Sequence, residues 1–402
     1  MLSEKFAVLF LVTFIVLAPL TAWHPVSASD SNLVILVSDN EADYALASSV
    51  AALLGAKLVV APWGSYNATV SAEVLTAQPS RVIIIGGPVA VVDEYAQDLK
   101  DFGIPYERWY GADRYGTNLA VMGYLKMEFP SQFSKIRDIA VVNGHDILAM
   151  RHYLLYYGRA QSGETWLLVL TDPRHINETL DTFEMVGLPQ NITYIVSISG
   201  NSQSPIFPLN RMQLEKWFNT HFGGLPPVGT DAIPPTSGEG VYKVLVEVQN
   251  RTQRADQYLD GLNLPGARAR LERAREYLSQ AWSAYNSGDA AGAYLLAVKA
   301  AFMANSVMLE VHRAMDTVFQ GSPKLRLSMK LRWMGDIIGY LKRHGYDVSS
   351  LEALLSQAES ALNAGQFEEV LQELHQIKEK MPSSVRKGRT PWHGNRGGHG
   401  RP

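Results

Sequence analysis

The sequence contains no cysteine among its 402 residues. Without thiols the chain forms no disulfide bond, has no thiol nucleophile and offers no thiolate ligand to a metal ion. Each folded domain must therefore be stabilised by its own apolar core.

A charge excess of either sign is also absent. The chain has 36 Lys and Arg residues against 39 Asp and Glu residues, which gives a formal net charge of -3. A nearly neutral chain produces no long-range field that would attract nucleic acid, so we expect no nucleic-acid partner. The hydrophobic share of 47% is typical of globular proteins, and the length suggests two or three domains.

Long apolar runs are missing except near the N-terminus. The run over residues 6–18 precedes a small-residue cleavage site, Val26-Ser27-Ala28, and this pattern predicts a secretory signal peptide over residues 1–28. The run is shorter than the ~20 residues that cross a bilayer. An uncleaved N-terminal anchor is the alternative, and it would be the only membrane contact. We expect the mature chain to be secreted or to lie at the cell surface.

Four N-x-[ST] sequons are possible glycosylation sites in an exported chain, although such short motifs also arise by chance. Their asparagines are Asn67, Asn177, Asn191 and Asn250.

Between residues 32 and 222, short apolar runs rich in β-formers alternate with Ala-rich helical segments. This alternation predicts βαβ units and parallel, Rossmann-like sheets. The runs recur in the same order after about a hundred residues, which predicts two tandem α/β modules over residues 32–130 and 131–222. The expected strands are Leu33–Val37, Leu58–Ala61, Val82–Ile85, Ile139–Val142, Leu167–Leu170 and Ile192–Ile198.

The second half of the chain has a different pattern. Residues 223–239 are rich in Pro and Gly and predict a linker. Residues 240–382 have helical spacing with about six helices, and the segment 278–288 repeats at 355–365, which predicts an all-α helical-hairpin bundle. Residues 383–402 are basic and rich in Gly and Pro, so we expect a disordered tail.

One pair of motifs carries a family resemblance. The expected strand Val82–Ile85 ends in Gly86-Gly87-Pro88, and further on Arg108 precedes Gly111-Ala112-Asp113-Arg114-Tyr115. Together these blocks resemble cell wall-binding repeat type 2 modules. The second module is degenerate, because Gly200 lacks a Gly neighbour and no Asp-Arg-Tyr element follows.

The resemblance implies a non-catalytic surface protein that attaches to an anionic cell-envelope polysaccharide or an S-layer glycan. It implies ligand-binding roles for Arg108 and Arg114, and the residues themselves add Asp113, Tyr115, Gly86 and Gly87 as candidate ligand-binding residues. Proteins of that family generally carry three modules, so a homo-oligomer or a partner protein is expected to supply what two modules lack.

The residues themselves leave two interpretations open. The Gly86-Gly87 turn can expose backbone N–H groups to an anion, or it can simply allow close strand–helix packing. Asp113 and Arg114 can fix their loop against the neighbouring module, or the guanidinium can bind a phosphate or carboxylate. Tyr115 offers a stacking surface for a sugar.

Motifs of surface hydrolases are missing: the chain has no H-E-x-x-H, no G-x-S-x-G and no S-x-x-K set before K-T-G. His145, His152 and His175 lie on different expected elements and are interpreted as polar surface residues. We therefore expect no catalytic residue, no metal and no cofactor.

Acidic residues also fail to form a catalytic pair in the sequence. Asp39, Glu41 and Asp43 stand at an expected helix start, where capping and the helix dipole favour carboxylates. The alternatives to a surface-binding protein are an envelope scaffold that acts through the helical domain and, with less support, a surface hydrolase.

Overall fold

The structure, a computed structural model, describes residues 32–158, 166–188, 192–199, 211–222, 228–232, 238–260 and 262–386. All of them belong to one compact unit, Ser31–Pro402. The expected signal peptide, Asn191, Gly200 and residues 387–402 of the expected tail lie outside the described residues.

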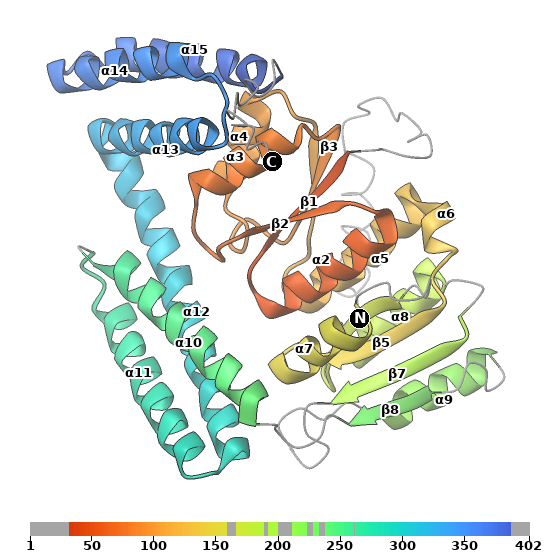
Figure 1. Ribbon diagram of the computed structural model, residues 1–402. Coiled ribbons are helices and arrows are strands. Elements are labelled where there is room, and N and C mark those ends of the chain that lie inside the picture. Colours follow the sequence, from red (N-terminus) through yellow and green to blue (C-terminus); the bar gives the residue numbers. More distant parts are fainter. Residues whose placement is uncertain are drawn as a thin grey trace, which may run out of the picture. The chain divides into compact units, whose positions relative to one another are not determined.

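Two four-stranded parallel sheets form the first half of the chain, as predicted (Figure 1). Their strand orders, β2-β1-β3-β4 and β6-β5-β7-β8, are the same, which confirms the internal repeat. The strands are β1 (Leu33–Ser38), β2 (Lys57–Ala61), β3 (Arg81–Ile85), β4 (Tyr106–Trp109), β5 (Asp138–Asn143), β6 (Trp166–Thr171), β7 (Tyr194–Ser199) and β8 (Val228–Ala232).

Helices connect these strands in the βαβ manner. Those of the first module are α2 (Glu41–Leu54), α3 (Ala68–Ala77), α4 (Asp93–Asp101), α5 (Arg114–Glu128) and the short α6 (Pro130–Phe133). Those of the second module are α7 (Ile147–Tyr156), α8 (Ile176–Val186) and α9 (Arg211–Phe222).

Both faces of the two central strands of the first sheet are buried, because β1 and β3 are apolar at nearly every position. Leu33, Ile35 and Val37 of β1 face a core that includes α2 and α5. Val34 and Leu36 face the opposite core, which includes α3 and α4. Continuous apolar strands are the pattern expected when helices cover both faces of a parallel sheet.

Side chains of the first module satisfy the outer edge of β6 in the second module. Asn118 of α5 donates to the carbonyl of Leu168 at 3.0 Å and accepts from the N–H of Leu170 at 3.1 Å. Ser49 of α2 donates to the carbonyl of Trp166 at 3.2 Å. These bonds supply partners to a strand edge that would otherwise be open.

Two boundaries differ from the expectation. The segment 223–239, expected as a linker, contains β8, which pairs with β7 from Ile195–Val228 to Ser199–Ala232. An edge strand bonds on one side only and carries few apolar side chains, so its apolar pattern is weak. The helix α15 also continues to Arg386, past the expected start of the tail at 383.

The second half of the chain is a helical bundle of hairpins, as predicted; α10, α11 and α12 lie side by side, and α14 packs on α15 (Figure 1). The two repeated segments end with Gly288 and Gly365, whose φ angles of 87° and 75° are the left-handed conformation expected after a helix. The helices are α10 (Gly238–Leu259), α11 (Pro265–Asn286), α12 (Ala290–Gly321), α13 (Pro323–Arg343), α14 (Ser349–Ala364) and α15 (Phe367–Arg386).

One described stretch, Ala290–Ala314 of α12, is long and apolar enough to cross a membrane by composition alone. Its residues Ala293, Ala297 and Ala300 are buried in the same core as α2 and α5. The stretch therefore serves as a core helix in this fold.

Candidate functional site

A cavity of about 740 Å³ lies at the carboxyl ends of β1, β5 and β6. Helices α10, α11 and α12 line its other side. In parallel sheets the carboxyl ends of the strands are the usual place for a ligand. We call this cavity the basic pocket and define it by its charged and imidazole side chains: Glu41, Arg114, His145, Asp172, Arg174, Arg251 and Lys299.

Arg114 connects the two modules at this pocket. It is the first residue of α5, whose N-cap Asp113 accepts a hydrogen bond from the N–H of Gly116 at 2.8 Å. The Arg114 guanidinium donates to the carbonyl of Gly144, directly after β5. Asp113 Oδ2 also lies 3.7 Å from His175 Nε2, so both Asp113 and Arg114 have a partner in the second module.

Tyr115 fills the contact between the modules and is buried. Its ring stacks on His175 with centroids 4.1 Å apart and meets His145 edge-on at 6.1 Å. Burial, followed by the nearby Asp172 carboxylate, raises the pKa of Tyr115. This placement favours the interpretation that the Asp-Arg-Tyr element fixes its loop against the neighbouring module, and it leaves no open face of Tyr115 for a sugar.

Gly144 permits this close approach, because a Cβ atom there would lie 2.9 Å from both Arg114 Cδ and Tyr115 Cε1. We expect Gly144→Ala to lower the free energy of unfolding by about 1–3 kcal/mol through overpacking. Chemical denaturation checks this value. The control is Gly123→Ala in α5, where nothing lies within 4 Å and a small stabilisation is expected. Equal effects of the two variants would contradict the prediction.

Gly86, Gly87 and Arg108 do not line the basic pocket, and their hydrogen bonds lie within the turn between β3 and α4. The Arg108 guanidinium donates to the carbonyls of Gly86 at 3.0 Å and Val91 at 2.8 Å, and to Asp93 at 3.1 Å. Gly86 has a φ of 121°, which side chains rarely adopt. These bonds give Arg108 a structural role in the strand–helix turn.

A buried ion pair joins α2 to α10 at the base of the pocket. Arg251 Nη2 lies 2.7 Å from Glu41 Oε1, and the two side chains are 10% and 8% exposed. Burial alone would raise the pKa of Glu41, but the charge of Arg251, hydrogen bonds to the carboxylate and the charge of Arg114 together lower it. Glu41 is therefore ionised at neutral pH and neutralises Arg251.

Asp172 organises the loop after β6. Burial opposes its ionisation, but hydrogen bonds from His175 Nδ1 at 2.8 Å and from the Arg174 N–H at 2.8 Å lower its pKa to about 2. Burial and the Arg114 charge lower the pKa of His145 to about 4. At neutral pH Asp172 is charged and His145 is neutral.

The pocket thus holds four cations against two carboxylates at neutral pH, an excess of two positive charges. Lys299 is exposed and makes no ion pair with any described residue. The amides of Asn40, Asn143 and Asn305 add hydrogen-bonding groups. This set of side chains suits an anion that carries phosphate or carboxylate groups.

The Asp172–His175 pair has the geometry of a base and its orienting carboxylate, but the described lining contains no Ser, Thr or Cys to serve as nucleophile. Within the described ranges, no group of three or more His, Asp and Glu residues is placed to hold a metal ion.

The three histidines separate into two places. His145 and His175 flank Tyr115, whereas His152 of α7 lies 2.7 Å from Asp231 of β8. The sequon residues Asn67, Asn177 and Asn250 are exposed.

Sequence reasoning missed three of the pocket's four cations. Arg174 follows the carboxyl end of β6, and ligands of parallel sheets usually bind at that edge. Its position in the sequence could therefore have identified it as a candidate site residue. Arg251 and Lys299 stand in ordinary helical patterns far along the chain and carry no local signal.

The fold and the pocket define a class: a protein of two tandem parallel-sheet modules with a C-terminal helical bundle. No family model matches the chain. An uncharacterized protein of Methanocaldococcus jannaschii is 38% identical over 192 residues, which are 46% of this chain and 54% of that protein. The chain thus spans about half the length of this relative.

A weak structural likeness links the chain to Cwp6 from Clostridium difficile. It covers 43% of this chain and 26% of the other, with a TM-score of 0.33 and 22% sequence identity. The resemblance to cell wall-binding repeats therefore stays a sequence-based prediction.

Proposed function

We propose that the protein is a non-catalytic, exported binding protein that holds an anionic envelope polysaccharide or glycan in the basic pocket. The observation that carries the proposal is the excess of positive charge at the carboxyl ends of the strands. Ligands of parallel α/β proteins bind at this edge, and guanidinium groups there can bind phosphate or carboxylate.

Two cations have the freedom to bind a ligand. Arg174 has a 77% exposed side chain and only a 3.5 Å contact with Asp172, and Lys299 is exposed on α12. Arg114 and Arg251 are engaged within the protein, so they supply positive potential and shape. The proposed ligand contacts therefore fall to Arg174 and Lys299.

Aromatic and amide groups favour a sugar over a bare anion. Phe302 is 64% exposed at the pocket, and Tyr277 lies beside Lys299, whose Nζ is 5.8 Å from the ring centroid. Pyranose rings stack on such faces while amides bind their hydroxyls.

Titration calorimetry of the full chain with polygalacturonate, and with neutral dextran for comparison, tests the proposal. The full chain is used because β8 belongs to the second sheet, so a fragment that ends before residue 228 would be incomplete. We expect salt-sensitive binding of polygalacturonate, and Arg174→Ala or Lys299→Ala should weaken it about tenfold, the loss of one charge-assisted hydrogen bond.

The matched control is Lys243→Ala on α10, a surface lysine that pairs with Glu239 outside the pocket. Its affinity should equal that of the wild type. Sedimentation with cell envelopes then tests surface attachment. If the Lys299→Ala and Lys243→Ala variants bind polygalacturonate equally well, the basic pocket is not the binding site. If the wild type binds neither polygalacturonate nor cell envelopes, the proposed function is refuted.

A further inference from the structure

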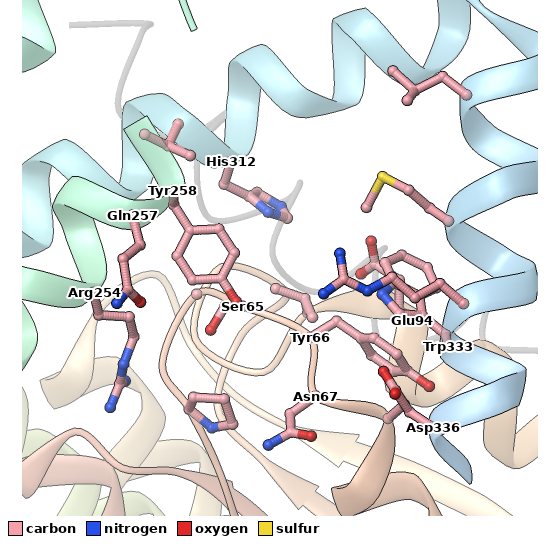
Figure 2. Close-up of a pocket in the computed structure, with 18 of the residues that line it drawn as sticks. Ser65, Tyr66, Asn67, Glu94, Arg254, Gln257, Tyr258, His312, Trp333 and Asp336 are labelled. Carbon is pink, nitrogen blue, oxygen red and sulfur yellow. The ribbon is translucent and has the colours of Figure 1, made fainter. Parts of the chain in front are cut away.

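A second cavity, of about 970 Å³, lies between the loop that follows β2 and helices α10, α12 and α13 (Figure 2). We call it the aromatic cavity, after Tyr66, Tyr258 and Trp333 in its lining. Helices α10 and α12 contribute to both cavities, but the two cavities have no lining residue in common.

The loop that forms one wall is held in a fixed conformation. Gly64, with a φ of 67°, donates its N–H to the carbonyl of Ala90 at 3.0 Å. The Asn67 N–H donates to the Tyr95 hydroxyl at 2.8 Å. A wall with such internal bonds needs no ordering when a ligand arrives, which favours binding.

Ser65 in this wall has an unused hydroxyl. Its side chain is 5% exposed and lines the cavity, and among the described residues Oγ has no hydrogen-bond partner. A buried polar group without a partner costs about 1–3 kcal/mol. A ligand hydroxyl that reaches Oγ would recover that energy.

Aromatic rings line the cavity around this hydroxyl. Tyr66 and Trp333 have centroids 4.5 Å apart with planes tilted by 53°, and Tyr258 of α10 belongs to the same lining (Figure 2). The negative face of an aromatic ring attracts the polarised C–H bonds of a pyranose ring. The rings therefore suit a sugar more than a flat, purely polar ligand.

The charges of the aromatic cavity balance. Arg254 and Arg332 stand against Glu94 and Asp336, whereas the basic pocket has a positive excess. A charge-balanced lining gives no net attraction to an anion but provides donors and acceptors for hydroxyl groups.

We propose that the aromatic cavity binds a short neutral oligosaccharide, with Ser65 as a hydrogen-bonding residue and Trp333 as a stacking residue. Its volume falls at the upper end of typical ligand pockets, about 300–1,000 Å³. This site is independent of the anionic ligand proposed for the basic pocket.

The test uses full-length protein made without N-glycosylation, because the sequon residue Asn67 lines the same cavity. Maltotriose, cellotriose and chitotriose are titrated by saturation-transfer NMR and calorimetry. We expect millimolar binding of at least one trisaccharide, with Ser65→Ala weakening it about two- to tenfold, the value of one hydrogen bond. Trp333→Leu should weaken it about tenfold or more.

Ser65→Ala should leave thermal stability unchanged or higher, since the hydroxyl has no partner to lose. Ser328→Ala is the matched control, because this serine lines the same cavity but its hydroxyl already donates to the carbonyl of Leu325 at 2.8 Å. Lys299→Ala in the basic pocket should keep full trisaccharide binding, which separates this proposal from the preceding one. No binding of any trisaccharide, or equal effects of Ser65→Ala and Ser328→Ala, would overturn the proposal.

Discussion

Arg251→Met is expected to lower the free energy of unfolding by about 3–5 kcal/mol, because it leaves the buried Glu41 carboxylate without its cation. The same change removes the bond from Arg251 of α10 to Glu41 of α2, which is one of the ion pairs between the helical half and the first module. Urea unfolding at neutral pH measures the loss.

Arg254→Met is the matched control, three residues further along the same helix. Arg254 pairs with Asp39 at 2.8 Å, but both side chains are about one-third exposed, at 31% and 35%. Solvent screens such a pair, so we expect a change of about 1 kcal/mol or less. Losses of the same size in the two variants would show that burial is not the source of the effect.

We expect the free energy of unfolding of the wild type to fall, relative to that of the Asp98→Asn variant, as the pH rises from about 4 to about 6. Asp98 of α4 is buried, and burial raises its pKa from 3.8 to about 6, against the hydrogen bonds from Ser71 and Tyr66 and the charge of Lys378. The folded state therefore holds the proton through a pH range in which the unfolded state has lost it.

The difference between the pKa of Asp98 in the unfolded state, 3.8, and in the folded state, about 6, corresponds to about 3 kcal/mol in the free energy of unfolding. This contribution is present below pH 4 and lost above pH 6. An asparagine does not titrate, so the difference between the two proteins isolates this group. Denaturant titrations at several pH values measure it, and a difference that stays constant with pH would rule out a raised pKa for Asp98.

The central strands and the edge strands β2 and β6 could be predicted from the sequence, whereas the edge strands β4 and β8 could not. β1 and β3 are buried on both faces and leave continuous apolar runs. β4 and β8 pair on one side only, and the sequence Val-Gly-Thr-Asp-Ala of β8 has the composition of a loop. The helix ends at Gly288 and Gly365 were easier to predict, because the left-handed backbone conformation that follows a helix favours glycine.

The site was predictable only in part, for a different reason. The motif that contains Arg114 and Tyr115 lies beside the basic pocket, but the contacts of these residues depend on Gly144 and His175 in another module. Contacts between residues far apart in sequence leave no periodic pattern. Arg108 shows the same limit, since its partners are backbone carbonyls that any sequence provides.

The bonds that Ser49 and Asn118 make to β6 have a consequence for how the molecule unfolds. They join the outermost strand of one sheet to two helices of the other module. Opening of the first module would leave backbone groups of β6 unpaired, and opening of the second would leave the side chains of Ser49 and Asn118 without these partners. The two repeats should therefore melt in a single cooperative transition. A truncated chain with only the second repeat would present a bare strand edge and a ready template for aggregation.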